Sequence, residues 1–161
     1  MNTVLIVDDS PINLTLIKAL VQKLGECEPV LFEHPQAALD WCRQTTPDLV
    51  IVDYMMPDMN GLQFIEAFRS LAGATDIPVL MVTANDQKEV RYQALQGGAN
   101  DFLTKPIDRV EFSARVRNML SLRDGQKFQI DWTRHLATMV DERTQAILAR
   151  EQELIYRMSR A

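Results

Sequence analysis

Short runs of apolar, mostly β-branched or aliphatic residues alternate along the chain with longer stretches in which apolar residues recur every three or four positions. The short runs predict strands and the longer stretches predict amphipathic helices. The predicted strands are residues 4–8, 29–32, 48–53, 77–82 and 101–104. The predicted helices are residues 11–24, 35–44, 61–71 and 86–96, and a fifth from about Asp108, a candidate N-cap, to about Leu122.

This strict alternation predicts the fold class. Strands that alternate with helices pair in parallel, are joined by right-handed crossovers and are covered on both faces. We therefore expect an α/β fold in which a five-stranded, parallel, doubly wound sheet occupies residues 1–122.

The sequence changes character after residue 122. Residues 123–127 contain Gly125 and predict a linker, whereas residues 128–161 contain no Pro or Gly and predict one extended helix. Arg143 and Arg150 interrupt its apolar stripe, which comprises Trp132, Leu136, Val140, Ile147, Leu154 and Met158. This coiled-coil-like pattern favours a linker helix that pairs with a partner, such as a second copy of the chain, over one that packs on its own domain. We expect it to lead to a further effector domain.

Composition and charge narrow the function classes. The chain has 161 residues, of which 47% are hydrophobic, and carries a net charge of −5. Residues 1–122 hold 10 Lys/Arg against 16 Asp/Glu, and residues 123–161 hold 7 against 6. An acidic domain with a mixed tail argues against direct binding of nucleic acid. No apolar run is long enough to span a membrane and no secretory leader is evident, so we expect a cytoplasmic protein.

Chemically useful side chains stand at the ends of four predicted strands. Asp8 and Asp9 end the first, Asp53 ends the third, Thr83 follows the fourth, and Lys105 follows the fifth. Ligands of doubly wound sheets bind beyond the carboxyl ends of the strands. These five side chains are therefore expected to share one site.

Phosphoryl transfer is the chemistry that suits this set. Three neighbouring carboxylates favour a hard divalent cation with oxygen ligands, such as Mg²⁺. Asp53 would act as the nucleophile, while Lys105 and the metal would stabilise charge on the phosphoryl oxygens. Thr83 and Lys105 would then hold the resulting acyl phosphate.

Four motifs, at successive strand ends, resemble the signature of the response-regulator receiver domain of two-component signalling. They are Val7-Asp8-Asp9, Asp53 to Pro57, Thr83-Ala84 and Lys105-Pro106. The resemblance covers about residues 1–122 and implies a flavodoxin-like sheet with strand order 2-1-3-4-5.

The resemblance also implies roles for individual residues. Asp53 becomes the phosphoacceptor, and Mg²⁺ is bound by Asp8, Asp9, Asp53 and the backbone carbonyl of Met55. Thr83 and Lys105 sense the phosphoryl group, and Thr83 forms a switch with the aromatic Phe102. The Lys105–Pro106 bond is expected to be cis. A sensor histidine kinase or a phosphotransfer protein is the implied phosphodonor.

Two other classes compete with this interpretation. A Mg²⁺-dependent small-molecule phosphohydrolase needs a general acid two residues after its nucleophile, where this chain has Met55. A flavin-binding protein needs a phosphate-cradling loop after the first strand, where Asp8 and Asp9 would repel phosphate. Both alternatives are disfavoured.

Residues 150–161 resemble the helix that opens cyclic-di-GMP phosphodiesterase domains of the HD-GYP type in receiver-fused regulators. The His-Asp metal ligands of that family are absent from the chain, so enzymatic activity here would be limited to gaining and losing one phosphoryl group. A diguanylate cyclase and a hybrid histidine kinase are the alternative outputs.

Overall fold

A computed structural model of the chain describes residues 1–84 and 88–159, and shows the expected alternation of strands and helices. The strands are β1 (Asn2–Val7), β2 (Cys27–Phe32), β3 (Leu49–Asp53), β4 (Val79–Thr83) and β5 (Asp101–Thr104). The helices are α1 (Pro11–Gln22), α2 (Pro35–Cys42), α3 (Gly61–Arg69), α4 (Lys88–Gln96) and α5 (Arg109–Ser159).

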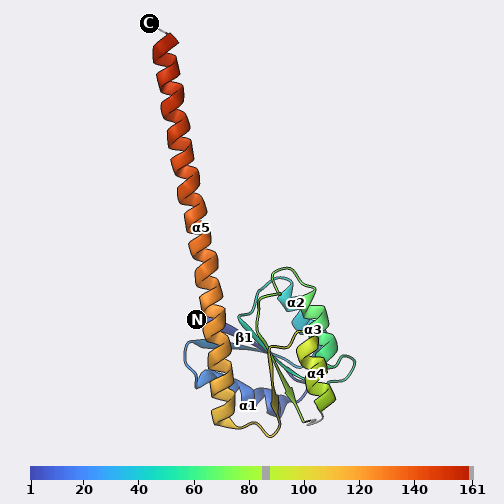
Figure 1. Cartoon of the computed structure of the whole chain (residues 1–161). Helices are drawn as coiled ribbons and strands as arrows, with labels where there is room; N and C mark the ends of the chain where they lie inside the picture. The colour runs from blue at the N-terminus through green and yellow to red at the C-terminus, as the bar shows by residue number, and fades with distance from the viewer. Residues whose placement is uncertain (85–87, 160–161) are drawn as a thin grey trace. The chain divides into compact units, whose positions relative to one another are not determined.

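All five strands pair in parallel in one sheet with the order β2-β1-β3-β4-β5. Every residue of β3 and β4 is buried, because helices cover both faces of the sheet. The predicted fold class and the strand order implied by the resemblance are therefore confirmed (Figure 1).

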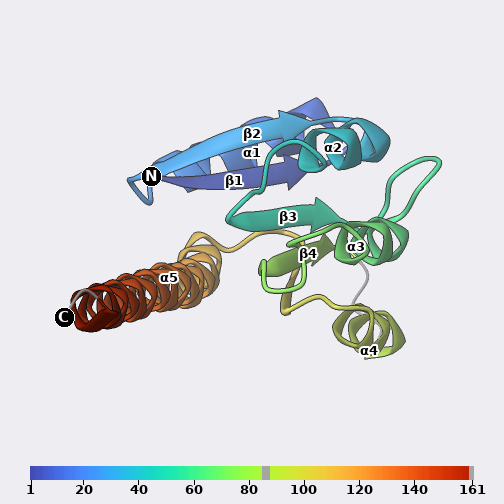
Figure 2. The ribbon, with the colours of Figure 1, turned by 90° about the horizontal axis from the view of Figure 1, so that it is seen from above.

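Two apolar layers enclose the sheet. Helices α2, α3 and α4 cover one face, where Leu39, Phe64 and Ala94 join one cluster of buried residues. On the other face, α1 and the first turns of α5 contribute Ile17 and Phe112 to a second cluster. Figures 1 and 2 show these helices on opposite sides of the strands.

Most differences from the predicted boundaries amount to one or two residues. Strand β1 ends at Val7 because the Asp8 side chain accepts a hydrogen bond from the Ser10 amide and turns the chain. Strand β2 begins at Cys27, two residues earlier than predicted, because it pairs along the whole of β1. The predicted start of the fourth helix at residue 86 lies outside the described residues.

The predicted break at residues 123–127 is wrong for the backbone, since α5 is one helix from Arg109 to Ser159. A glycine inside a helix costs only about 1 kcal/mol relative to alanine. Good helix formers on both sides of Gly125 outweigh that cost. The candidate cap at Asp108 is confirmed, because its side chain accepts hydrogen bonds from the amides of Val110 and Glu111 at 2.8 and 3.0 Å.

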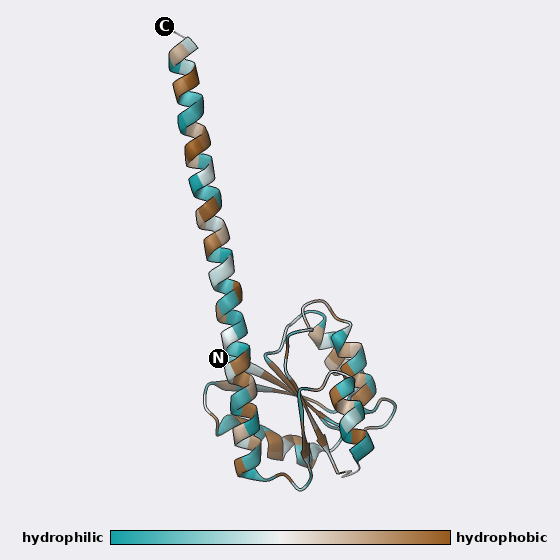
Figure 3. Cartoon of the chain, viewed as in Figure 1, coloured by the Kyte–Doolittle hydropathy of each residue, from teal (hydrophilic) through white to brown (hydrophobic). Residues whose placement is uncertain are grey.

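The chain divides into two units, Met1–Arg123 and Asp124–Ala161. In the second unit the described residues form the continuation of α5, and almost all of their side chains are exposed. Hydrophobic and hydrophilic residues alternate along this part of the helix (Figure 3). Within residues 1–84 and 88–159, no helix is long and apolar enough to cross a membrane.

Candidate functional site

The structure brings together three carboxylates at the carboxyl ends of β1 and β3. One oxygen from each of Asp8, Asp9 and Asp53 lies within 4.8 Å of the others. Asp8 is completely buried, Asp53 is 5% exposed and Asp9 is exposed. Their positions follow from the topology, because β1 and β3 are hydrogen-bonded neighbours that end at the same edge of the sheet.

Lys105 brings a positive charge into this cluster from the loop after β5. Its Nζ atom lies 3.1 Å from Asp53 Oδ1 and 3.8 Å from Asp8 Oδ2. The Lys105–Pro106 peptide bond is cis, as predicted. The strand ends thus place one ammonium group against the two buried carboxylates.

The electrostatic environment raises the pKa of both buried carboxyl groups. For Asp53, burial is the main cause and the charge of Asp8 adds to it, while Lys105 acts in the opposite direction. Burial also raises the pKa of Asp8, against the hydrogen bond from the Ser10 amide and the charge of Lys105. One cation therefore does not compensate the buried negative charge.

The residues present fit a divalent cation. Asp8 Oδ1 accepts a hydrogen bond from the Ser10 amide at 2.9 Å. Asp8 Oδ2 is buried, and within the described parts of the chain no donor forms a hydrogen bond with it. A buried carboxylate oxygen without a donor, next to two further carboxylates, is the kind of ligand that Mg²⁺ prefers.

Thr83 and Phe102 lie on two neighbouring strands. Thr83 ends β4, is 1% exposed and is in register with Thr104 of β5. Phe102 is in register with Met81, two residues before Thr83. Side chains two residues apart on a strand point to the same face, so Thr83 and Phe102 share one side of the sheet. The switch role of this pair remains a prediction.

Gly61 contributes to the site in a way that none of the sequence motifs indicates. A Cβ atom on Gly61 would lie 2.7 Å from the main-chain oxygen of Asp53. The Gly61 amide also donates a hydrogen bond to the carbonyl of Tyr54 at 2.8 Å. The loop after β3 can therefore close only without a side chain here. Met55 lies in this loop with its side chain 66% exposed, so its assigned metal contact remains a prediction about its carbonyl.

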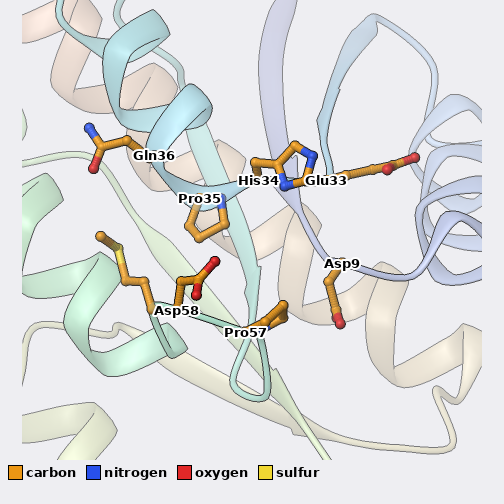
Figure 4. A pocket seen from close by; sticks show the side chains of 8 residues that line it. Asp9, Glu33, His34, Pro35, Gln36, Pro57 and Asp58 are labelled. Atoms are coloured by element: carbon orange, nitrogen blue, oxygen red, sulfur yellow. The ribbon is translucent and has the colours of Figure 1, made fainter.

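A cavity of about 320 Å³ opens beside the acidic cluster. Asp9 forms one wall, His34 and Pro35 contribute from the start of α2, and Pro57 and Asp58 contribute from the loop after β3 (Figure 4). His34 occupies the N-cap position of α2 but makes no capping hydrogen bond through its side chain. The cavity leaves free space next to the exposed carboxylate of Asp9.

Comparison with known proteins identifies the class that this fold and site define. A family model described as the response regulator receiver domain matches residues 4–117. The chain belongs to the response regulator receiver domain family.

Individual relatives support the same assignment. The chain is 34% identical over 163 residues to the cyclic di-GMP phosphodiesterase response regulator RpfG of Xanthomonas campestris, an alignment that covers 98% of this chain and 42% of RpfG. It is 38% identical over 117 residues to the response regulator PleD of Caulobacter vibrioides, covering 72% of this chain and 25% of PleD. The chain thus spans less than half the length of these two relatives.

A similar solved structure is the receiver domain of the sensor histidine kinase PA1611 from Pseudomonas aeruginosa. It shares 27% identity and a TM-score of 0.68 with this chain, over 74% of this chain and 98% of that domain. A magnesium ion is coordinated in the active-site cleft of that structure.

Proposed function

We propose that Asp53 is the phosphoacceptor of this receiver domain. A carboxylate oxygen of Asp53 attacks the phosphorus atom of the donor, so that a P–O bond forms while the bond from phosphorus to the donor's leaving atom breaks. The Lys105 ammonium group balances charge on the transferred phosphoryl oxygens. Bound Mg²⁺, held by Asp8, Asp9, Asp53 and the carbonyl of Met55, supplies further positive charge to those oxygens.

The distance of 3.1 Å between Lys105 Nζ and Asp53 Oδ1, within a cluster of three carboxylates, is the observation that carries this proposal. It supports Asp53 over Asp8 as the nucleophile, because Asp53 lies nearest to the cation. Thr83 is buried at the end of β4. We assign to its hydroxyl group the role of donating a hydrogen bond to the phosphoryl oxygens once Asp53 is phosphorylated.

The test is labelling with a small phosphodonor, such as phosphoramidate, in the presence of Mg²⁺. Intact mass is expected to show one added phosphoryl group on the wild type and none on Asp53→Asn. Asp58→Asn is the matched control, because Asp58 has a positive φ of 68°, which asparagine also tolerates. Undiminished labelling of the Asp53 variant would overturn the assignment.

Receiver domains take their phosphoryl group from histidine kinases or phosphotransfer proteins, and a protein of that kind is the proposed donor. The donor breaks a P–N bond at its histidine, and the imidazole leaves with its electron pair. Rapid transfer from one purified kinase of the source organism, absent with Asp53→Asn, would identify that partner. Transfer that is equally fast to both variants would contradict the proposed route.

We further propose that the complete protein carries a cyclic-di-GMP phosphodiesterase as its output. The alignment with RpfG covers 98% of this chain and so includes the second unit, whereas that with PleD covers 72%. This difference favours the phosphodiesterase over a diguanylate cyclase or a hybrid kinase. The test is to extend the protein along its native gene and to measure cyclic-di-GMP hydrolysis with Asp53 intact and as Asn. A continuation that encodes a cyclase or kinase domain would refute the proposal.

We propose that the tail helix, which is the part of α5 from Asp124 to Ser159, pairs with a second copy of the chain. Val140, Ile147 and Leu154 repeat every seven residues and are exposed, and the tail's nearly balanced charge does not oppose self-association. Arg143 and Arg150 fall on the same face and would weaken the pair enough for it to respond to phosphorylation. Sedimentation measures the oligomeric state of the wild type and of Ile147→Lys, which is expected to weaken the pairing. A wild type that stays monomeric both with and without a beryllofluoride mimic would contradict the proposal.

A further inference from the structure

The ring of Phe102 is covered by the guanidinium group of Arg91. Arg91 Cζ lies 4.8 Å from the centroid of the ring, within the range in which a guanidinium group is attracted to an aromatic face. Both side chains are half-buried. Together with Lys88, Tyr92 and Leu95 they line a surface cavity of about 220 Å³. Phe102 thus lies partly buried at the edge of the core, and a side chain from α4 covers its ring.

Phe102 lies on β5, which pairs with β4, the strand that ends at Thr83. Phe102 and Thr83 share one side of the sheet through the pairing of β4 with β5. If the ring turned from this position toward Thr83 while Arg91 kept its place on α4, the ring would leave the guanidinium group. The stack therefore stabilises the outward position of the ring over an inward one.

We propose that Arg91 is a positioning residue that sets how readily phosphorylation moves Phe102. This inference rests on the proposed phosphorylation of Asp53 and on the predicted switch, in which the ring of Phe102 turns toward Thr83 when Asp53 is phosphorylated. The attraction of Arg91 to the ring is lost when the ring turns inward, so it acts against the phosphorylated conformation. A planar guanidinium group stacks on a ring face more effectively than a compact ammonium group, which makes arginine the residue suited to this position.

The size of the effect follows from the exposure of the pair. A cation–π contact at a half-exposed site shifts an equilibrium by about two- to fivefold. Arg91→Gln keeps a long side chain of good helix propensity and removes the cation. It is expected to raise the affinity of the Mg²⁺-loaded protein for beryllofluoride by that factor, with Arg91→Lys intermediate.

Two controls separate the stack from a general change of charge. Lys88→Gln removes one positive charge from the same helix and the same cavity, and is expected to leave the affinity unchanged. In a Phe102→Leu background, Arg91→Gln is also expected to have no effect, because the ring is absent. An increase that persists in this background would overturn the proposal.

A spectroscopic measurement reports on the stack directly. In the wild type, the side-chain Hδ resonances of Arg91 are expected to be shifted upfield by the ring current of Phe102, and to lose that shift when beryllofluoride binds. Unshifted Arg91 resonances in the free protein, or an unchanged affinity in Arg91→Gln, would refute the inference. A wild type that fails to bind beryllofluoride with Mg²⁺ would instead refute the proposed function.

Discussion

Replacing Asp53 by asparagine is expected to stabilise the metal-free protein, because it removes one of the clustered negative charges and keeps the size of the side chain. At an effective dielectric constant of about 20, like unit charges at the upper limit of 4.8 Å repel by roughly 3.5 kcal/mol, and opposite charges 3.1 Å apart attract by roughly 5 kcal/mol. Among the residues that the structure describes, Asp53 has two carboxylate neighbours and one ammonium neighbour. Burial of Asp53 adds a desolvation cost.

The repulsion and the desolvation together therefore outweigh the attraction to Lys105. Because Asp9 is exposed, solvent screens its charge and reduces this difference. We expect Asp53→Asn to raise the free energy of unfolding by about 1–3 kcal/mol at neutral pH. For a domain of this size, each kcal/mol corresponds to roughly 3–6 °C in Tm. Thermal unfolding followed by circular dichroism in the presence of a chelator measures this shift.

The stability gained by Asp53→Asn is expected to depend on pH. Burial and the charge of Asp8 raise the pKa of Asp53 in the folded protein above its ordinary value of 3.8. Below that value the carboxyl group is neutral in both the folded and unfolded states, and the variant gains nothing. The gain then grows as the pH rises through the pKa of the folded state.

Asp58→Asn, outside the cluster, is the control and should change the stability by less than about 0.5 kcal/mol. A loss of stability in Asp53→Asn at neutral pH, or a gain that is independent of pH, would refute the electrostatic reasoning.

Three further predictions follow from the same structure. Mg²⁺ at one hundred times its Kd should stabilise the wild type by about 2.7 kcal/mol and Asp53→Asn by much less, as thermal shifts will show; equal shifts would contradict the metal site. Gly61→Ala should destabilise the protein by about 1–3 kcal/mol, because the new Cβ atom would clash with the carbonyl of Asp53. Gly125→Ala should instead stabilise the helix by up to about 1 kcal/mol, because a Cβ atom there would have no neighbour within 4 Å. Arg123→Met should cost about 1–3 kcal/mol in urea unfolding, because Asp48 Oδ1, 3.6 Å from Arg123 Nε, keeps its buried charge, and adding Asp48→Asn should recover part of that loss.

The strands and the acidic cluster were predictable from the sequence, because both rest on short-range patterns combined with one rule of topology. The buried runs of β3 and β4 are continuous apolar segments. Once such strands are parallel, Asp8, Asp53 and Lys105 must emerge at the same edge. Their convergence needed no knowledge of side-chain packing.

Other features depend on distances that no local pattern contains. The tight fit of Gly61 against the Asp53 carbonyl arises only when α3 packs back onto the end of β3. The contact of Arg91 with Phe102 depends on how α4 is rotated about its axis relative to β5. The continuity of α5 through Gly125 has a different cause, since the helix formers on both sides outweigh one unfavourable residue.

The two ends of β3 differ in how far the negative charge of a buried aspartate is balanced by its neighbours. Before its first residue, Asp48 accepts a hydrogen bond from the Thr3 amide at 2.8 Å and faces the guanidinium group of Arg123. At its last residue, Asp53 shares the ammonium group of Lys105 with a second buried carboxylate. Both aspartates are buried, but only the second site gathers more negative charge than its surroundings balance. That excess is expected to lower the stability of the metal-free fold, and it favours the binding of a divalent cation at this end of the strand.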